Sequence, residues 1–201
     1  MTLIGRVAFA VLLIAVGITP TAAQQSQAGQ FIKQLGDQAI GALRSPNGSL
    51  AQRETDYRRI LSENFDIPFI GRFVLGRHWT RASAEQQGDY LRLFQEFLVK
   101  TYSSRLGGYA GETLVIVAER PGGGQDTVVR TRIERPSGPP IEADWRVRQQ
   151  NTGPRIIDVE VAGVSMALTQ RAEFDSVIQR NGIDGLIEVL RAKTSKLAAT
   201  N

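Results

Sequence analysis

The sequence contains no cysteine and only one histidine among its 201 residues. The absence of cysteine excludes disulfide bonds, thiolate nucleophiles and cysteine-ligated metal sites. The single histidine, His78, cannot form a metal site made of histidines, and no Gly-x-Ser-x-Gly segment indicates a serine nucleophile. We therefore expect His78 to be an ordinary loop or interface residue, and we predict no metal site and no cofactor.

A short apolar run near the N-terminus follows a single basic residue. Arg6 precedes the run Val7–Ile18, and Thr21–Ala23 supply the small residues of a signal-peptidase site. The run is too short to span a bilayer comfortably, and no cysteine is available for a lipid anchor. We predict that residues 1–23 are a cleaved signal peptide and that residues 24–201 form a single exported domain.

Basic residues outnumber acidic residues only slightly. The 24 lysines and arginines against 20 aspartates and glutamates give a formal net charge of +4, which loss of Arg6 would lower by one. The two signs alternate along the chain, and no basic run is interleaved with aromatic residues, so the sequence argues against nucleic-acid binding. Contacts with acidic partners or lipid headgroups stay open.

Four segments of alternating apolar and polar residues, 113–119, 127–134, 141–148 and 155–162, are separated by short clusters of Gly, Pro and Asn. This pattern predicts four antiparallel strands joined by hairpins, over about residues 112–162. One face of the predicted sheet, which we call the dry face, carries apolar side chains, and the opposite, wet face carries Arg, Asp and Glu. The dry-face set is Val129, Thr131, Ile133, Ile141, Ala143, Trp145, Val147, Ile157, Val159 and Val161.

The distribution of polar groups argues against an enzyme. Asp144 and Asp158 fall on the wet face, where cross-strand ion pairs are expected and useful pKa shifts are not. The dry face offers only Thr131 as a polar group, whereas a cavity enzyme of the ketosteroid isomerase type needs an acid or base there. Two alternatives follow from the residues, a filled core or an apolar cavity, and the apolar content of 42% suits both.

Apolar residues with helical spacing flank the predicted sheet on both sides. They predict helices over 27–44, from Ser49 to 64, over 67–75, over 84–106 and from about 166 to the C-terminus, with a break at Asn181–Gly182. Ser49 with Gln52, and Ser83 with Gln86, have the spacing of capping boxes. The predicted fold class is therefore α+β, with a one-sided sheet wrapped by N- and C-terminal helices.

Several segments together resemble the MlaC family, the periplasmic phospholipid shuttles of the Mla lipid-asymmetry (toluene-tolerance) system. The similar segments are Tyr57–Pro68, Val74–Trp79, Phe94–Leu98 with Tyr102, Ile157–Ser165, Arg171–Ile178 and Asn181–Leu186. The resemblance implies helices and sheet enclosing an apolar pocket for phospholipid acyl chains. It also implies a monomeric periplasmic carrier that exchanges lipid with an outer-membrane lipoprotein complex and an inner-membrane ABC transporter complex.

On this interpretation the lipid contacts come from the dry face and from the apolar sides of two helices. The expected lipid-binding residues are Phe69, Phe73, Phe94, Phe97, Leu98, Tyr102, Val129, Ile133, Ile141, Trp145, Val147, Val159 and Val161. The expected partner-docking residues are Arg72, Arg77 and Arg81.

The resemblance leaves the lipid class open. Ala162 stands before Gly163, where an acidic residue would be expected, and members linked to hopanoid metabolism share much of the pattern. The alternatives are a carrier of hopanoids or other lipids, a cavity enzyme of the isomerase type, and a filled-core module that recruits partners through arginine-rich surfaces.

Overall fold

The computed structural model describes residues 26–44, 49–103 and 110–199. The predicted signal peptide lies outside these ranges, as does the predicted end of the helix over 84–106. The elements in chain order are α1 (Gln27–Leu43), α2 (Leu50–Asn64), α3 (Ile67–Leu75), the 3-10 helix η1 (Gly76–Arg81), α4 (Ala84–Ser103), β1 (Thr113–Gly123), β2 (Asp126–Glu134), β3 (Ile141–Gln150), β4 (Gly153–Val161), β5 (Val164–Ser165) and α5 (Met166–Ala199).

The sheet is an antiparallel meander in the order β1-β2-β3-β4-β5. The four predicted strands are confirmed, and β5 is a short fifth strand that the sequence pattern did not indicate. Val161 pairs with Val164 across Ala162 and Gly163, both of which have positive φ, as a two-residue hairpin turn requires. The first strand also continues beyond its predicted end and includes Pro121, which pairs with Thr127. A proline is tolerated there because β1 is an edge strand of the sheet.

The predicted dry face is confirmed by the register of the inner strands, with one interruption. Trp145 pairs with Val129 on one side and with Val159 on the other. A bulge in β4 then brings Ile156, rather than Ile157, opposite Val147. Both isoleucines are buried, because the extra residue of a bulge breaks the alternation of faces that the sequence pattern assumes.

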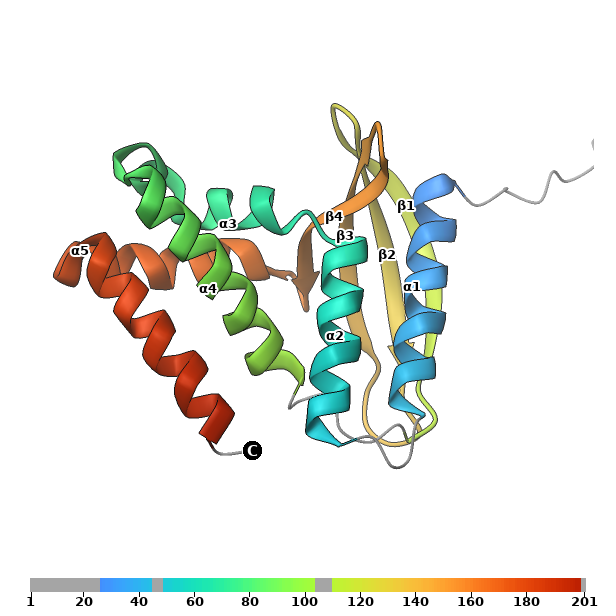
Figure 1. Ribbon diagram of the computed structural model, residues 1–201. Coiled ribbons are helices and arrows are strands. Elements are labelled where there is room, and N and C mark those ends of the chain that lie inside the picture. Colours follow the sequence, from blue (N-terminus) through green and yellow to red (C-terminus); the bar gives the residue numbers. More distant parts are fainter. Residues whose placement is uncertain (1–25, 45–48, 104–109, 200–201) are drawn as a thin grey trace, which may run out of the picture.

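The helices form two groups around the sheet. Figure 1 shows α1 and α2 side by side over one face of the sheet, with α3, α4 and α5 gathered beside it. The first group packs on the dry face in a core that includes Ile32, Val129 and Ile156. The second group has its own core, centred on Tyr90, Phe94 and Phe174, whose rings contact one another.

Local signals in the sequence set the helix ends. Ser49 accepts a hydrogen bond from the backbone N–H of Gln52, and Ser83 and Gln86 form a reciprocal capping box at α4. The predicted break in the last helix is a kink at Gly182, whose φ of 71° and ψ of −177° favour glycine. Among the helices of the described ranges, none combines the length and the apolar character needed to cross a membrane.

The wet face carries the expected cross-strand ion pairs. Asp144 accepts hydrogen bonds from Arg130 at 2.7 Å and Arg120 at 3.3 Å, while Asp126 accepts from Arg148 at 2.7 Å. The guanidinium of Arg130 holds the pKa of Asp144 below its usual range, and Arg148 does the same for Asp126. These carboxylates therefore stay ionised at neutral pH and hold the strands in register.

Candidate functional site

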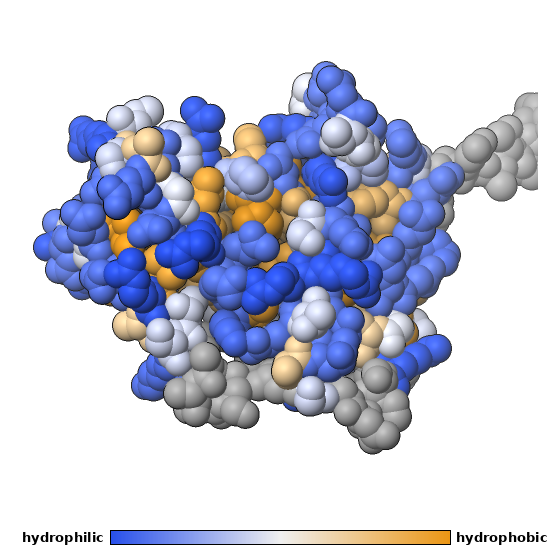
Figure 2. Space-filling view, viewed as in Figure 1, coloured by the Kyte–Doolittle hydropathy of each residue, from blue (hydrophilic) through white to orange (hydrophobic). Residues whose placement is uncertain are grey.

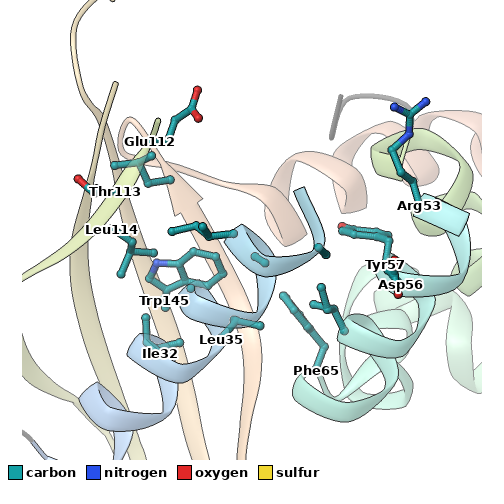
Figure 3. Close-up of a pocket in the computed structure, with 16 residues that line it drawn as sticks. Ile32, Leu35, Arg53, Asp56, Tyr57, Phe65, Glu112, Thr113, Leu114 and Trp145 are labelled. Carbon is teal, nitrogen blue, oxygen red and sulfur yellow. The ribbon is translucent and has the colours of Figure 1, made fainter. Parts of the chain in front are cut away.

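Two apolar pockets lie between the sheet and the helices. Pocket 1 has a volume of about 320 Å³ and is bounded by α1, α2 and the start of β1 (Figure 3). Pocket 2 has a volume of about 260 Å³ and is bounded by α2, α3, α4, β4 and the start of α5. Tyr57, Phe65 and Trp145 line both, so the two pockets meet at these three side chains.

The surface around the pockets is polar. Figure 2 shows a mainly hydrophilic face, with hydrophobic residues visible in the recesses between the helices. Figure 3 shows Trp145 and Leu35 on one side of pocket 1, facing Tyr57 and Phe65 on the other. A cavity of this size with an apolar lining suits an apolar ligand.

Trp145 is held in place by the one polar side chain predicted for the dry face. Its indole Nε1 donates a hydrogen bond of 2.8 Å to Thr131 Oγ1, and Thr131 in turn donates to the carbonyl of Ala143 at 3.2 Å. Thr131 is fully buried. The dry-face hydroxyl therefore orients the ring shared by the two pockets.

The other two shared residues come from α2 and its C-terminal end. Phe65 forms a bridge with Ile156, and the backbone N–H of Asp66 donates to the carbonyl of Ile156 at 2.9 Å, which ties the end of α2 to β4. The ring of Tyr57 lies 6.5 Å from that of Tyr102. Burial raises the pKa of Tyr57 far above its usual range, so its phenol stays neutral.

Seven of the expected lipid-binding residues line the pockets. Ile133 and Trp145 line pocket 1, and Trp145 also lines pocket 2 with five further members of the set: Phe94, Leu98, Tyr102, Val159 and Val161. The structure thus brings residues of α4, β3 and β4 together around one apolar space. Their contact with lipid stays a prediction.

The remaining expected residues line neither pocket. Val129 and Val147 are fully packed in the core beneath α1, and Ile141 is half-buried near the start of β3. The three remaining phenylalanines each have a cation over the ring: Phe69 lies 4.5 Å from Arg148, Phe73 lies 5.3 Å from Arg171 and Phe97 lies 5.5 Å from Lys193. These side chains lie in the core or at the surface beside the pockets. The sequence could not separate them from pocket residues, because alternation and helical spacing show which face a side chain lies on but not whether it borders a cavity.

The contribution of the N-terminal helices to the site was not predicted from the sequence. Ile32, Leu35, Ala39 and Ile60 line pocket 1 from α1 and α2, and Leu114 lines it from β1. Leu35 and Ala39 have the four-residue spacing of one helix face in the sequence. Residues packed in a filled core have the same spacing, so the sequence gave no sign that these side chains line a cavity.

The three arginines expected to dock partners lie on and beside η1. Arg72 is exposed, with its guanidinium 5.5 Å from the ring centre of Trp79, and Arg81 is also exposed. Arg77 pairs with Asp175 of α5 at 3.0 Å. Their role in docking stays a prediction.

His78 makes a contact that joins two helices. It is buried in η1, and its Nε2 lies 2.7 Å from Asp175 Oδ1. This contact and the nearby Arg77 hold the pKa of Asp175 below its usual range, with the His78 hydrogen bond as the larger cause. The cluster joins η1 to α5 and lines neither pocket.

The carboxylates near the pockets also have structural partners. Asp158 lines pocket 2, yet it accepts hydrogen bonds from Ser165 Oγ at 2.6 Å and from the backbone N–H of Ala167 at 3.1 Å, at the start of α5. Within the described ranges, no group of three or more Asp, Glu or His side chains is arranged to hold a metal ion.

This arrangement defines an α+β protein with an apolar binding cavity between its sheet and its helices. The chain belongs to the MlaC protein family, whose model matches residues 33–192. It is 25% identical over 194 residues to the intermembrane phospholipid transport system binding protein MlaC of Haemophilus influenzae, a match that covers 92% of this chain and 90% of that protein. The predicted family is confirmed.

A solved structure shares the fold. It is the phospholipid-binding protein of Ralstonia solanacearum in complex with a phospholipid, with a TM-score of 0.77 and 24% sequence identity. The similarity covers 87% of this chain and 99% of that one. The predicted fold class, helices on a one-sided antiparallel sheet, is therefore confirmed, with β5 as an addition.

Proposed function

We propose that this protein is a periplasmic lipid carrier that holds the acyl chains of a phospholipid in its two adjacent pockets. The observation that carries the proposal is the meeting of the pockets at Tyr57, Phe65 and Trp145. Two narrow apolar spaces that share one wall suit a ligand with two apolar chains. The names of the relative and of the structural neighbour, both of which refer to phospholipid, support this choice of ligand.

The burial of acyl chains supplies enough free energy for such a carrier. At about 0.8 kcal/mol per buried CH₂, a chain of about 16 carbons contributes on the order of 12 kcal/mol before other terms. Two chains would exceed the practical affinity limit of roughly 20 kcal/mol, so ordering of the chains and incomplete burial must offset part of this. Lipid bound this tightly dissociates slowly without help.

Slow release implies that partners take part in loading and unloading. We propose an outer-membrane lipoprotein complex and an inner-membrane ABC transporter complex of the Mla type as those partners. The name of the Haemophilus influenzae relative, which places it in an intermembrane transport system, supports a periplasmic location and this role. We propose no catalytic step, since Thr131 and Asp158 already hold structural hydrogen bonds.

Lipid analysis of purified protein tests the proposal. The chain is expressed with its N-terminal segment and purified without detergent, and lipid is extracted with solvent and quantified by mass spectrometry against protein. We expect co-purified phospholipid in a reproducible ratio. Protein that is repeatedly free of lipid, and that takes up none from vesicles, would contradict the carrier function.

A pocket-filling variant sharpens this test. Ala39→Trp places an indole in the lining of pocket 1 and should lower the lipid-to-protein ratio. Ala51→Trp, at an exposed position of α2, is the matched control and should leave the ratio unchanged.

A further inference from the structure

Among the described residues that line pocket 1, three side chains are charged: Arg53, Asp56 and Glu112. Figure 3 shows Arg53 and Glu112 on opposite sides of one end of the pocket, which we call the rim, away from Leu35 and Phe65. A ligand whose chains fill the pocket therefore brings its polar end to these groups.

Arg53 has a buried donor with nothing to bind. Its Nε is buried and makes no hydrogen bond, and within the described ranges Arg53 takes part in none of the ion pairs. Arg58, five residues along the same helix, contrasts with it, because both of its terminal nitrogens donate to Glu96. A buried donor without an acceptor is unfavourable, so an acceptor supplied by a ligand would be bound there.

The two carboxylates of the lining do not fill this need. Asp56 accepts a hydrogen bond of 3.3 Å from Gln52 Nε2, and it lies 3.9 Å from Arg59, which is not part of the lining. Glu112 accepts a hydrogen bond of 2.8 Å from the backbone N–H of Ala110. That bond is the largest cause that holds the pKa of Glu112 below its usual range, so this side chain stays an acceptor. Among the described charged residues of this lining, the group left without a partner is therefore the guanidinium Nε of Arg53, beside an apolar cavity.

We infer that Arg53 binds the phosphate of the lipid whose acyl chains occupy pocket 1, and so selects phosphate-bearing lipids over neutral ones. This inference rests on the proposed function. A guanidinium matches the geometry of phosphate oxygens, and charge-assisted hydrogen bonds are stronger than neutral ones. Arg53 lies outside the dry face, whose side chains include no charged group that could bind a headgroup. A phosphate-binding Arg53 also disfavours an uncharged polycyclic lipid as the cargo.

Competition between two lipids with identical acyl chains tests the inference. Delipidated full-length mature protein is mixed with equal amounts of dioleoyl phosphatidylglycerol and dioleoylglycerol, re-purified, and the bound lipids are quantified by mass spectrometry. We expect the wild-type protein to prefer the phospholipid by about tenfold or more. Arg53→Met should lose most of this preference while binding dioleoylglycerol as before, and Arg53→Lys should keep part of it.

Control variants and a free anion separate the possible outcomes. Arg59→Met makes the same change of charge on the same helix outside the pocket lining and should keep the wild-type preference. Excess inorganic phosphate should leave lipid bound, since it lacks the chains, and displacement by phosphate alone would overturn the assignment to a lipid. Equal binding of the two lipids by the wild type, or an unchanged preference in Arg53→Met, would also overturn it. Equal binding leaves the carrier function intact, whereas failure to bind either lipid contradicts both.

Discussion

The hydrogen bond between Trp145 and Thr131 couples the interior of the sheet to the shape of the cavity. The strand pattern correctly predicted that both side chains lie on the dry face. Thr131 is not the only polar side chain on that face, because Thr127 pairs with the dry-face residue Val147. The strand pattern could not predict that Thr131 is occupied by the indole, because a pattern of alternation contains no information on side-chain rotamers. The same limit explains why Val129 and Val147 were grouped with true pocket residues.

Removal of this hydroxyl should destabilise the protein. Thr131→Val leaves the indole N–H of Trp145 without its acceptor, and the free energy of unfolding should fall by about 1–3 kcal/mol. Urea denaturation of lipid-free protein measures this change. Thr127→Val, at a half-buried position of the same strand and face, is the control and should change stability by less than about 0.5 kcal/mol. Equal effects of the two substitutions would show that the hydrogen bond is unimportant.

Asp126 should give the protein a stability that depends on pH. The hydrogen bonds from Arg148 and then Arg146 hold its pKa below its usual range in the folded state. Its contribution is therefore fully present above the unfolded-state pKa of about 3.9 and is lost as pH falls through the folded-state pKa.

Asp126→Asn should cost about 1–3 kcal/mol at pH 7, because two arginines lose a buried charged acceptor. The difference between variant and wild type should narrow as pH falls below 4, and urea denaturation at several pH values measures it. Glu134→Gln, in an exposed pair with Arg132, should cost less than about 1 kcal/mol at pH 7. A cost for Asp126→Asn that does not change with pH would contradict the ion-pair explanation.

The last helix and the fourth strand show which features of an element can be foreseen. The kink at Gly182 was predictable, because Asn-Gly is a common helix terminator and Gly182 adopts a conformation that other residues avoid. The bulge in β4 was not predictable, because Ile156 and Ile157 are both β-branched and apolar and either could face the core. The pairing partner Val147 decided the register, and partners are a property of the folded sheet.

Gly182→Ala should destabilise the protein through the backbone alone. Nothing lies within 4 Å of a Cβ added at this position, so a steric clash would not cause the loss of stability. The cause would be the φ of +71°, which residues other than glycine rarely adopt. The expected cost is about 1–3 kcal/mol. Gly88→Ala, in α4 and also without contacts at the added Cβ, should instead be stabilising by up to about 1 kcal/mol. Thermal unfolding of both variants measures the contrast, and a neutral Gly182→Ala would mean that the kink can straighten.

For the molecule as a whole, the sequence left a filled core and a cavity equally open, and the structure contains both. The dry face is filled where α1 covers Val129 and Ile156, and it is hollow on either side of Trp145. Composition could not separate these regions, because core and cavity use the same apolar residues. What distinguishes them is the spacing between α2, the sheet and the second helical group, which depends on contacts between elements far apart in the sequence.

Partner docking is the property of the whole molecule that remains a prediction. Arg72 and Arg81 are exposed around η1, whereas Arg77 pairs with Asp175. Charge reversal at Arg72 and Arg81 should therefore change the surface charge while the Arg77–Asp175 pair stays intact. The double variant Arg72→Glu with Arg81→Glu should weaken binding to an isolated partner complex of the Mla type. The weakening should be largest at low salt, since exposed charges act mainly on association and are screened by ions.

Binding of immobilised partner complexes at two salt concentrations, together with the lipid-to-protein ratio, measures this prediction. The lipid content of the double variant should stay at the wild-type value, because neither arginine lines a pocket. Arg135→Glu, in the β2–β3 connection, is the control for a change of charge elsewhere on the surface and should bind partners normally. Normal partner binding by the double variant would place docking on another face, and loss of lipid with intact docking would mean that these arginines support the cavity instead.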